Sequence, residues 1–464
     1  MLIWVGMTGI SRRKLLRNTG AAGAAGTVGA SSLFSGCVED VVGEGGLKIG
    51  VLNPYSVIGR WGKISTWGFL SGLASVYGDD PIPLNPDGFW AGERVVYEPE
   101  DRRYEMVLRD STYKPSTAEE GATALVADEE VDVLYGMVDS SSAIRVIEQV
   151  AKPTDTIYLT GGTSSPSITA NPDYCGRKVF RANEHIGMEA RALSKYIGDE
   201  TDTDEVYLLA VDNTYGRTAA PPYRRYLEAN GVEVVGERFV PGGFGEFRAV
   251  LEDIDEQANA VVGVFAGRTM QTYLTSLVDG NASGAFDLRA HNVLPGAVGT
   301  GFIGGALETA LGEVTEEAIE SANLGGMVTR YHWNQYDNPM NDDFVSGYEE
   351  TYGTLPALFA CGAFASGSAV AQAVEATGSL DGDDLAEEMY GMTIEKTPKG
   401  ENAYTFQDYN NQAKSEMTIA EVVPNDRESW DELVMPSEPV ARISPDDATI
   451  PRDDPDMTCD LTAQ

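Results

Sequence analysis

Histidine and cysteine are rare in this sequence, and long apolar runs are missing from its main part. The 464 residues include three His (His185, His291 and His332) and four Cys, with no CxxC pair and no two His four residues apart. We therefore expect neither a zinc centre nor another metal or cofactor. Beyond the first forty residues no stretch reaches about 18 consecutive apolar residues, so no transmembrane helix is expected there.

Positive charge is also in short supply. The chain has 33 Lys plus Arg, only ten of them Lys, against 72 Asp plus Glu, which gives a formal net charge of −39. Such a charge repels phosphate backbones and anionic lipid surfaces, which excludes nucleic-acid binding and peripheral binding to an acidic membrane. The acidic residues are spread along the whole chain, as on the carboxylate surface of a protein from a very salty habitat, where salt screens their repulsion. An ordinary acidic secreted protein is the alternative.

The first 37 residues are typical of an export signal that ends in a lipidation site. A twin-arginine pattern at 11–16 precedes a stretch of small and apolar residues at 20–34, and the lipobox-like run 33–37 ends at Cys37. We expect export by the twin-arginine route, lipidation of Cys37 and a location on the extracellular face of the cytoplasmic membrane. A basic helix with an incidental Cys is the alternative. Residues 38–46 are interpreted as an acidic tether.

Short apolar runs alternate with amphipathic stretches along the rest of the chain. Strands are expected at 47–52, 131–136, 156–160, 205–211, 260–265 and 293–294, with helices such as 117–128 and 142–151 between them. Strands separated by helices of this length imply crossover connections and mainly parallel sheets with both faces covered. There are more of these strand–helix units than a single sheet would hold. The sequence therefore predicts an α/β fold with two lobes, each a doubly wound sheet.

Eight segments follow one another in a distinctive order: 47–62, 110–136, 136–142, 160–166, 180–181, 212–216, 245–247 and 344–374. In this order they resemble the solute-binding proteins of ABC transporters with the type I periplasmic-binding fold, in particular the leucine-binding-protein-like group that takes branched-chain amino acids, amides or urea. The likeness extends over about 47–425, and the acidic composition suggests a haloarchaeal member.

The resemblance implies two lobes joined by three hinge crossings. Lobe one would comprise 47–180 plus 329–392, and lobe two 181–328 plus 393–425. The remaining residues, 426–464, are rich in Asp and Pro, so they are expected to wrap around the lobes or dangle rather than join a core.

Polar loops that follow two expected strands are the predicted ligand site, because ligands of open α/β sheets bind beyond the carboxyl ends of the strands. Free N–H groups at a helix start suit a carboxylate or amide oxygen. The resemblance assigns Ser140 and Ser164 to the carboxylate-like end of a ligand and the Thr163 carbonyl to its amino end, with Ser141 in the same loop. The alternative is that these residues merely cap helices.

Aromatic residues extend the predicted site to both lobes. The resemblance places Trp61 and Tyr215 over the ligand, where flat rings bury its apolar part. Phe265 and Ala266 replace the ligand-facing Tyr that relatives often carry. Ordinary core packing is the alternative for each ring.

The sequence departs from amino-acid binders at the loop that supplies an acidic partner for the ligand's ammonium, which here reads 294–298 without an acid. A buried ammonium without such a partner is costly. Asp139 or Glu184 could replace it. A neutral amide, or a carboxylate without an α-amino group, therefore stays open beside amino acids.

Two further patterns are weighed against this interpretation. Residues 299–304 match G-x-G-x-x-G, but they lie late in the chain and follow Pro295-Gly296, so we interpret them as a flexible ligand-side loop before a helix at Ala306. No nucleophile elbow or His-containing triad is recognisable, so an enzyme is not expected. Cys175 and Cys361 could form a disulfide or remain buried thiols.

The sequence thus predicts an extracellular receptor of an ABC importer that closes over a small polar solute without turnover. Its partners, implied by the resemblance, would be a permease and an ATPase, and a lipid anchor would hold it to the membrane. A signalling sensor with the same fold is the alternative, and an exported enzyme is less favoured.

Overall fold

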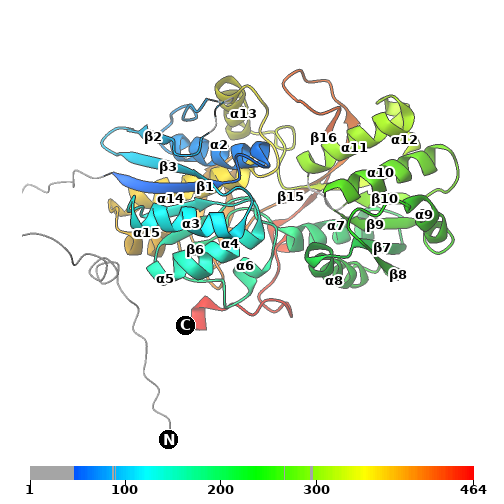
Figure 1. The fold of residues 1–464 in the computed structure, drawn as a ribbon, viewed down its shortest axis with the longest axis horizontal. Coiled ribbons are helices and arrows are strands. Elements are labelled where there is room, and N and C mark those ends of the chain that lie inside the picture. The colour runs from blue at the N-terminus through cyan, green and yellow to red at the C-terminus, as the bar shows by residue number, and fades with distance from the viewer. Residues whose placement is uncertain (1–45, 86–87, 89, 266, 293–295, 464) are drawn as a thin grey trace, which may run out of the picture.

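Two α/β lobes, each built on its own central sheet, make up the protein (Figure 1). The computed structural model describes residues 46–463 apart from 86–87, 89, 266 and 293–295. The predicted export signal with Cys37, the tether up to residue 45, Ala266 and the strand expected at 293–294 lie outside the described residues. Within the described part, none of the helices combines the length and the apolar character that crossing a bilayer requires.

The first sheet has the strand order β2–β3–β1–β4–β5–β6; β2 is antiparallel to β3 and the other pairs are parallel. Successive residues of β1 point to opposite faces, so Leu47, Ile49 and Val51 join one core while Leu52 joins another. The apolar run therefore buries both of its sides, as a covered parallel sheet requires. The strands are β1 (Leu47–Asn53), β2 (Arg94–Tyr97), β3 (Tyr104–Asp110), β4 (Val133–Gly136), β5 (Ile157–Thr160) and β6 (Val179–Phe180).

The second sheet has the order β16–β15–β11–β10–β9–β7–β8, with a parallel part from β11 to β8 and antiparallel β15 and β16. It too carries a core on each face. The predicted fold class, two mainly parallel sheets covered by helices, is confirmed. The strands are β7 (Glu205–Val211), β8 (Glu233–Val240), β9 (Ala260–Val264), β10 (Arg289–Asn292), β11 (Leu324–Thr329), β15 (Met417–Pro424) and β16 (Val434–Ile443).

Helices cover both faces of each sheet (Figure 1). Those of the first lobe are α2 (Gly59–Ser75), α3 (Pro115–Ala127), α4 (Ser140–Val146) with a π-helical turn (Ile147–Ala151), α5 (Lys152–Thr154), α6 (Ser167–Ala170), α13 (Pro339–Tyr352), α14 (Ala360–Thr377) and α15 (Gly382–Met389). Those of the second are α7 (Ile186–Glu200), α8 (Thr214–Ala229), α9 (Phe247–Asp255), α10 (Gly267–Ala282), α11 (Gly296–Leu311), α12 (Glu316–Ser321) and α16 (Pro445–Ala448). A 3₁₀ turn (Leu461–Ala463) lies near the C-terminus.

A small third sheet divides the segment that was expected to belong to lobe two. Its strands are β12 (Thr393–Thr397), β13 (Gly400–Phe406) and β14 (Ala413–Lys414). Ile394, Tyr404 and Phe406 join the core of the first lobe, because these three side chains are the apolar inner face of the hairpin. Only from β15 onward does the chain pair with the second sheet.

The C-terminal residues wrap around the lobes, one of the two expected outcomes, but they also join the cores, which was not expected. Val434–Ile443 form the edge strand β16, which pairs with β15, and Trp430 and Val434 belong to the cores of the first and second lobe. The chain then returns to the first lobe, where the N–H groups of Thr458 and Cys459 donate to the Ala170 carbonyl over 2.9 and 2.8 Å. This return adds a fourth passage between the lobes to the crossings at 181–185, 330–338 and 415–416.

A disulfide between Cys175 and Cys459 fixes this return. The suggested Cys175–Cys361 bond is therefore wrong. Cys361 is a free thiol in α14, buried in the first core, where burial raises its pKa to about 12. A thiol in that setting stays protonated and unreactive.

Candidate functional site

A constrained turn leads from β4 into the predicted ligand loop. Gly136 has φ 134°, and a Cβ there would lie 2.2 Å from the Leu52 carbonyl oxygen, so only glycine fits. Met137 follows with φ 66°, a left-handed conformation that is strained for a bulky residue and tends to persist at functional sites. Asp139 then caps α4: its Oδ1 accepts from the N–H of Ser142 over 2.8 Å.

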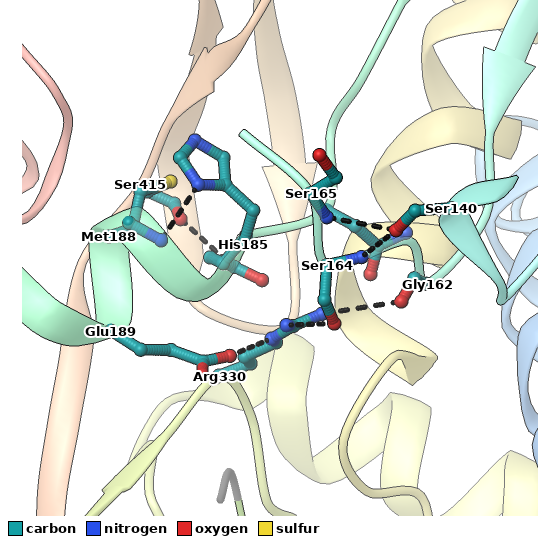
Figure 2. Close-up of polar contacts among 12 residues, drawn as sticks. Ser140, Gly162, Ser164, Ser165, His185, Met188, Glu189, Arg330 and Ser415 are labelled. Carbon is teal, nitrogen blue, oxygen red and sulfur yellow. Dashed lines mark hydrogen bonds and ion pairs between the residues drawn. The ribbon is translucent and has the colours of Figure 1, made fainter. Parts of the chain in front are cut away.

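Ser140 joins the two predicted ligand loops. Its Oγ accepts hydrogen bonds from the N–H groups of Ser164 and Ser165, over 3.2 and 2.9 Å (Figure 2). Ser141 is exposed and donates to Asp139 Oδ1 over 3.0 Å. Thr163 is fully buried, and its Oγ1 has no hydrogen-bond partner in the described structure. The structure therefore brings Ser140, Thr163 and Ser164 together and leaves Ser141 on the outside.

A guanidinium group from the second crossing reaches this loop. Arg330 follows β11, and its Nη2 donates to Ser164 Oγ over 3.0 Å, while Nη1 reaches the Gly162 carbonyl at 3.5 Å (Figure 2). Its Nε donates to Glu189 Oε1 on α7 over 2.5 Å. Both charged side chains are almost fully buried, at 1% and 2% exposure. Burial raises the pKa of Glu189, an effect that the Arg330 charge partly opposes.

A second buried guanidinium, that of Arg181, also binds the backbone of this loop. It donates to the carbonyl oxygens of Ser165 and Pro166 and to the side chains of Thr169 and Gln412, all of them neutral partners. Burial, with the nearby Arg330 charge, holds the pKa of Arg181 well below its usual range. The two arginines thus fix the loop backbone and make its surroundings electropositive.

The acids considered as ammonium partners are already engaged. Glu184 Oε1 accepts from Lys399 Nζ over 2.8 Å, from the Tyr404 hydroxyl over 2.9 Å and from Ser415 Oγ over 2.5 Å. Burial would raise the pKa of Glu184, but the Lys399 ammonium and these hydrogen bonds hold it below the usual value. Asp139 serves as the cap of α4, although its Oδ2 is buried without a partner in the described structure.

The predicted aromatic residues lie in different settings. Trp61 is half-buried and meets Phe359 edge-on, with ring centroids 6.0 Å apart. Tyr215 is half-buried on α8, and burial together with the Glu189 charge raises its pKa. Phe265 is fully buried and packs against Tyr273, with ring centroids 4.8 Å apart, so its ring belongs to the core of the second lobe.

A cavity of about 310 Å³ lies between the lobes. Its walls include Arg60, Trp61 and Leu358 from the first lobe and Gln271, Phe302 and Glu432 from the second. A space of this size suits a small organic molecule. Trp61 connects the cavity through Phe359 to the polar loop, because the Arg330 guanidinium lies 5.7 Å from the Phe359 ring centroid.

The glycine motif at 299–304 lies inside α11, so the flexible loop that was expected there is wrong. The residues that the sequence did not reveal are Arg330, Glu189 and Glu432. No motif marks them; the one available signal is that Arg330 is a scarce cation at an expected crossing. Among the described residues, no three His, Cys, Asp or Glu side chains are grouped so that they could hold a metal ion.

A family model described as periplasmic binding protein matches residues 98–428. A comparison with curated protein sequences gives no match.

Solved structures share the fold over nearly their whole length. An ABC-transporter solute-binding protein from Rhodopseudomonas palustris BisB5, in complex with 3,4-dihydroxybenzoic acid, has a TM-score of 0.64 and 18% identity, covering 86% of this chain and 97% of its own. An ABC-type branched-chain amino acid transporter from R. palustris CGA009 has a TM-score of 0.67 and 21% identity, and the match covers 87% of this chain and 98% of its own. An amino acid ABC transporter substrate-binding protein from Pseudomonas fluorescens Pf-5 has a TM-score of 0.70 and 17% identity, and the match covers 90% of this chain and 99% of its own.

Proposed function

We propose, from the premise that this chain belongs to the periplasmic binding protein family, that it is the solute receptor of an ABC importer. In this proposal the lobes close over a small solute that contacts the loop of Ser140, Thr163 and Ser164. Trp61 and Tyr215 lie on opposite lobes and would enclose its apolar part. Closure would follow from contacts that exist only when both lobes touch the solute.

The ligand class that we propose is a small carboxylate without an α-ammonium group. The observation that carries it is the hydrogen bond from Arg330 to Ser164. A carboxylate at this loop would meet a cationic donor, whereas an ammonium would meet a like charge within a few ångströms. In agreement with this class, the structural neighbour from R. palustris BisB5 is in complex with 3,4-dihydroxybenzoic acid.

An amino acid is the second candidate, and one observation favours it. Asp139 Oδ2 is buried without a partner in the described structure, so an ammonium reaching it would gain an ion pair. Three of the similar solved structures carry the names of amino acid transporter proteins.

We also propose that the receptor works outside the cell, exported by the twin-arginine route and held by a lipid on Cys37, with a permease and an ATPase as partners. The Cys175–Cys459 disulfide supports this location, because disulfides persist in oxidising compartments.

A melting screen in molar KCl tests the function. The panel holds 4-hydroxybenzoate, 3,4-dihydroxybenzoate, isovalerate, leucine, isoleucine, isobutyramide and urea. A ligand at a hundredfold excess over its Kd adds about 2.7 kcal/mol of stability, which shifts the Tm measurably. The shift should vanish in Ser164→Ala and persist in Ser141→Ala, the matched control. A Tm shift with leucine but with none of the carboxylates that lack an α-ammonium group would overturn the proposed ligand class. If no solute of the panel shifts the Tm, the proposal that the protein is a receptor for such solutes fails.

A further inference from the structure

The loop between β15 and β16, residues 425–433, is a built structure rather than a loose connection. The Asn425 N–H donates to the Leu433 carbonyl over 3.1 Å, which closes the base of the loop. The side-chain amide of Asn425 donates to the Trp430 carbonyl over 2.9 Å, and the N–H of Arg427 donates to Asn425 Oδ1 over 2.8 Å. The loop therefore holds its tip in a defined position.

An aromatic anchor fixes this loop to the second crossing. Trp430 is 2% exposed and packs on His332 and Trp333, with ring centroids 5.1 and 4.6 Å away. Its Nε1 donates to the Val434 carbonyl over 2.9 Å, at the start of β16. Because Trp430 packs on the crossing and joins the core of the first lobe, the loop is anchored at the junction of the two lobes.

The glycine motif of α11 provides the seat of the loop on the second lobe. A Cβ at Gly301 would lie 2.9 Å from Glu432 Oε2, and a Cβ at Gly304 would lie 3.0 Å from Leu433 Cβ. A side chain at position 301 would displace the Glu432 carboxylate, and one at position 304 would press against Leu433. The motif that resembles a dinucleotide fingerprint thus has a packing role within a helix.

From this seat the loop reaches the first lobe. Glu432 forms an ion pair with Arg60 on α2, and the Arg60 guanidinium lies 5.2 Å from the Trp430 ring centroid. Both charged residues line the cavity between the lobes. The side chains are 39% and 23% exposed for Arg60 and Glu432, so the contact lies at the mouth of the cavity and not in a core.

We propose that Glu432 and Arg60 form a latch that holds the two lobes together at the mouth of the cavity, with residues 425–433 as its arm and Gly301 and Gly304 as its seat. Both are positioning residues: the latch raises the population of the closed lobes and slows the loss of whatever the cavity holds. The contact itself does not depend on the identity of the solute; its role in retaining a solute rests on the proposed function.

The test measures the distance between the lobes without any solute, so that its failure is distinct from failure of the ligand screen. Spin labels are placed on exposed positions of the two lobes through Val96→Cys and Glu256→Cys, and pulsed EPR is recorded in 1 M KCl. The parent chain for labelling carries Cys37→Ser; Cys361 is buried and Cys175 and Cys459 are disulfide-bonded, so these three do not take the label.

Glu432→Gln, Arg60→Gln and Gly301→Val should each lower the closed population about two- to fivefold, the range expected for one partly exposed ion pair. The double variant Arg60→Gln with Glu432→Gln should match the singles, and the charge swap Arg60→Glu with Glu432→Arg should recover part of the loss. Gly305→Ala is the matched control on α11, since its Cβ would meet Gln271 at an ordinary 3.4 Å. Distance distributions that equal the parent's in all three single variants would overturn the latch.

Discussion

The Arg330 guanidinium donates to the Ser164 hydroxyl over 3.0 Å, which ties the second chain crossing directly to a loop at the edge of the first sheet. Glu189, on the first helix of the second lobe, completes the contact from the other side. A rotation of the lobes would therefore change the hydrogen bond between Arg330 and Ser164, next to the candidate ligand loop, even if the ion pair with Glu189 stayed intact.

Removing the charge of Arg330 should destabilise the protein strongly. In Arg330→Met the Glu189 carboxylate stays buried without its partner, and such changes cost about 3–5 kcal/mol. Chemical unfolding measures the loss. Arg248→Met is the control, because its partners Glu252 and Asp279 are exposed and the expected change is below about 1 kcal/mol. Equal losses in both variants would contradict the buried pair.

Ser140 and Ser141 should differ although they are neighbours. Ser140→Ala leaves the N–H groups of Ser164 and Ser165 without their acceptor, which should lower the free energy of unfolding by about 1–3 kcal/mol and loosen the loop. Ser141→Ala removes an exposed hydroxyl and should cost less than about 0.5 kcal/mol. Thermal melting of the two variants, together with hydrogen exchange of the loop, measures the difference. A larger loss of stability in Ser141→Ala than in Ser140→Ala would refute the prediction.

Stability should fall as the pH is lowered below about 6.5. Burial lowers the pKa of His291 and of His332 to about 3. Between that value and the ordinary pKa near 6.5, the unfolded chain binds protons that the folded chain does not, so each His should cost about 2 kcal/mol at pH 5 relative to pH 7.5. Urea unfolding at the two pH values measures the loss, and His291→Gln should reduce it. The same pH dependence with and without His291 would speak against this account.

Breaking the disulfide should release the C-terminal return. Cys175→Ala, Cys459→Ala and the double variant should lower the Tm by similar amounts, because each removes the same link, with up to about 5 kcal/mol of stability at stake. Cys361→Ala is the control, because it removes a cysteine that is not part of the disulfide. Additive losses in the double variant would mean that each cysteine acts separately.

The sequence was most informative where one physical effect dominates. β1, β4, β5, β7 and β9 overlap the expected ranges, since apolar runs in a covered parallel sheet leave few other uses for such residues. β16 was missed because it contains Pro436 and Pro439, which normally argue against a strand. It is the edge strand of its sheet, where a missing N–H is tolerated.

The site was only partly predictable, for a related reason. Ser140, Thr163 and Ser164 follow strands that the sequence reveals, so their meeting could be expected. Arg330, Glu189 and Glu432 come from a crossing, a helix and a hairpin loop, and only the folded chain brings Arg330 to Glu189 and Glu432 to the wall of the cavity. The pairing of Cys175 with Cys459 was likewise open, because sequence does not determine disulfide connectivity.

The same disulfide makes the molecule partly circular. Cys175 and Cys459 are 284 residues apart, so the bond encloses the entire second lobe, the helices α13 to α15 of the first lobe and all passages between the lobes in one covalent ring. A protease that cuts one loop of this ring opens it without releasing a fragment. The nicked chain would still migrate as a single species until a reductant is added, which gives the protein a measure of resistance to a first cut.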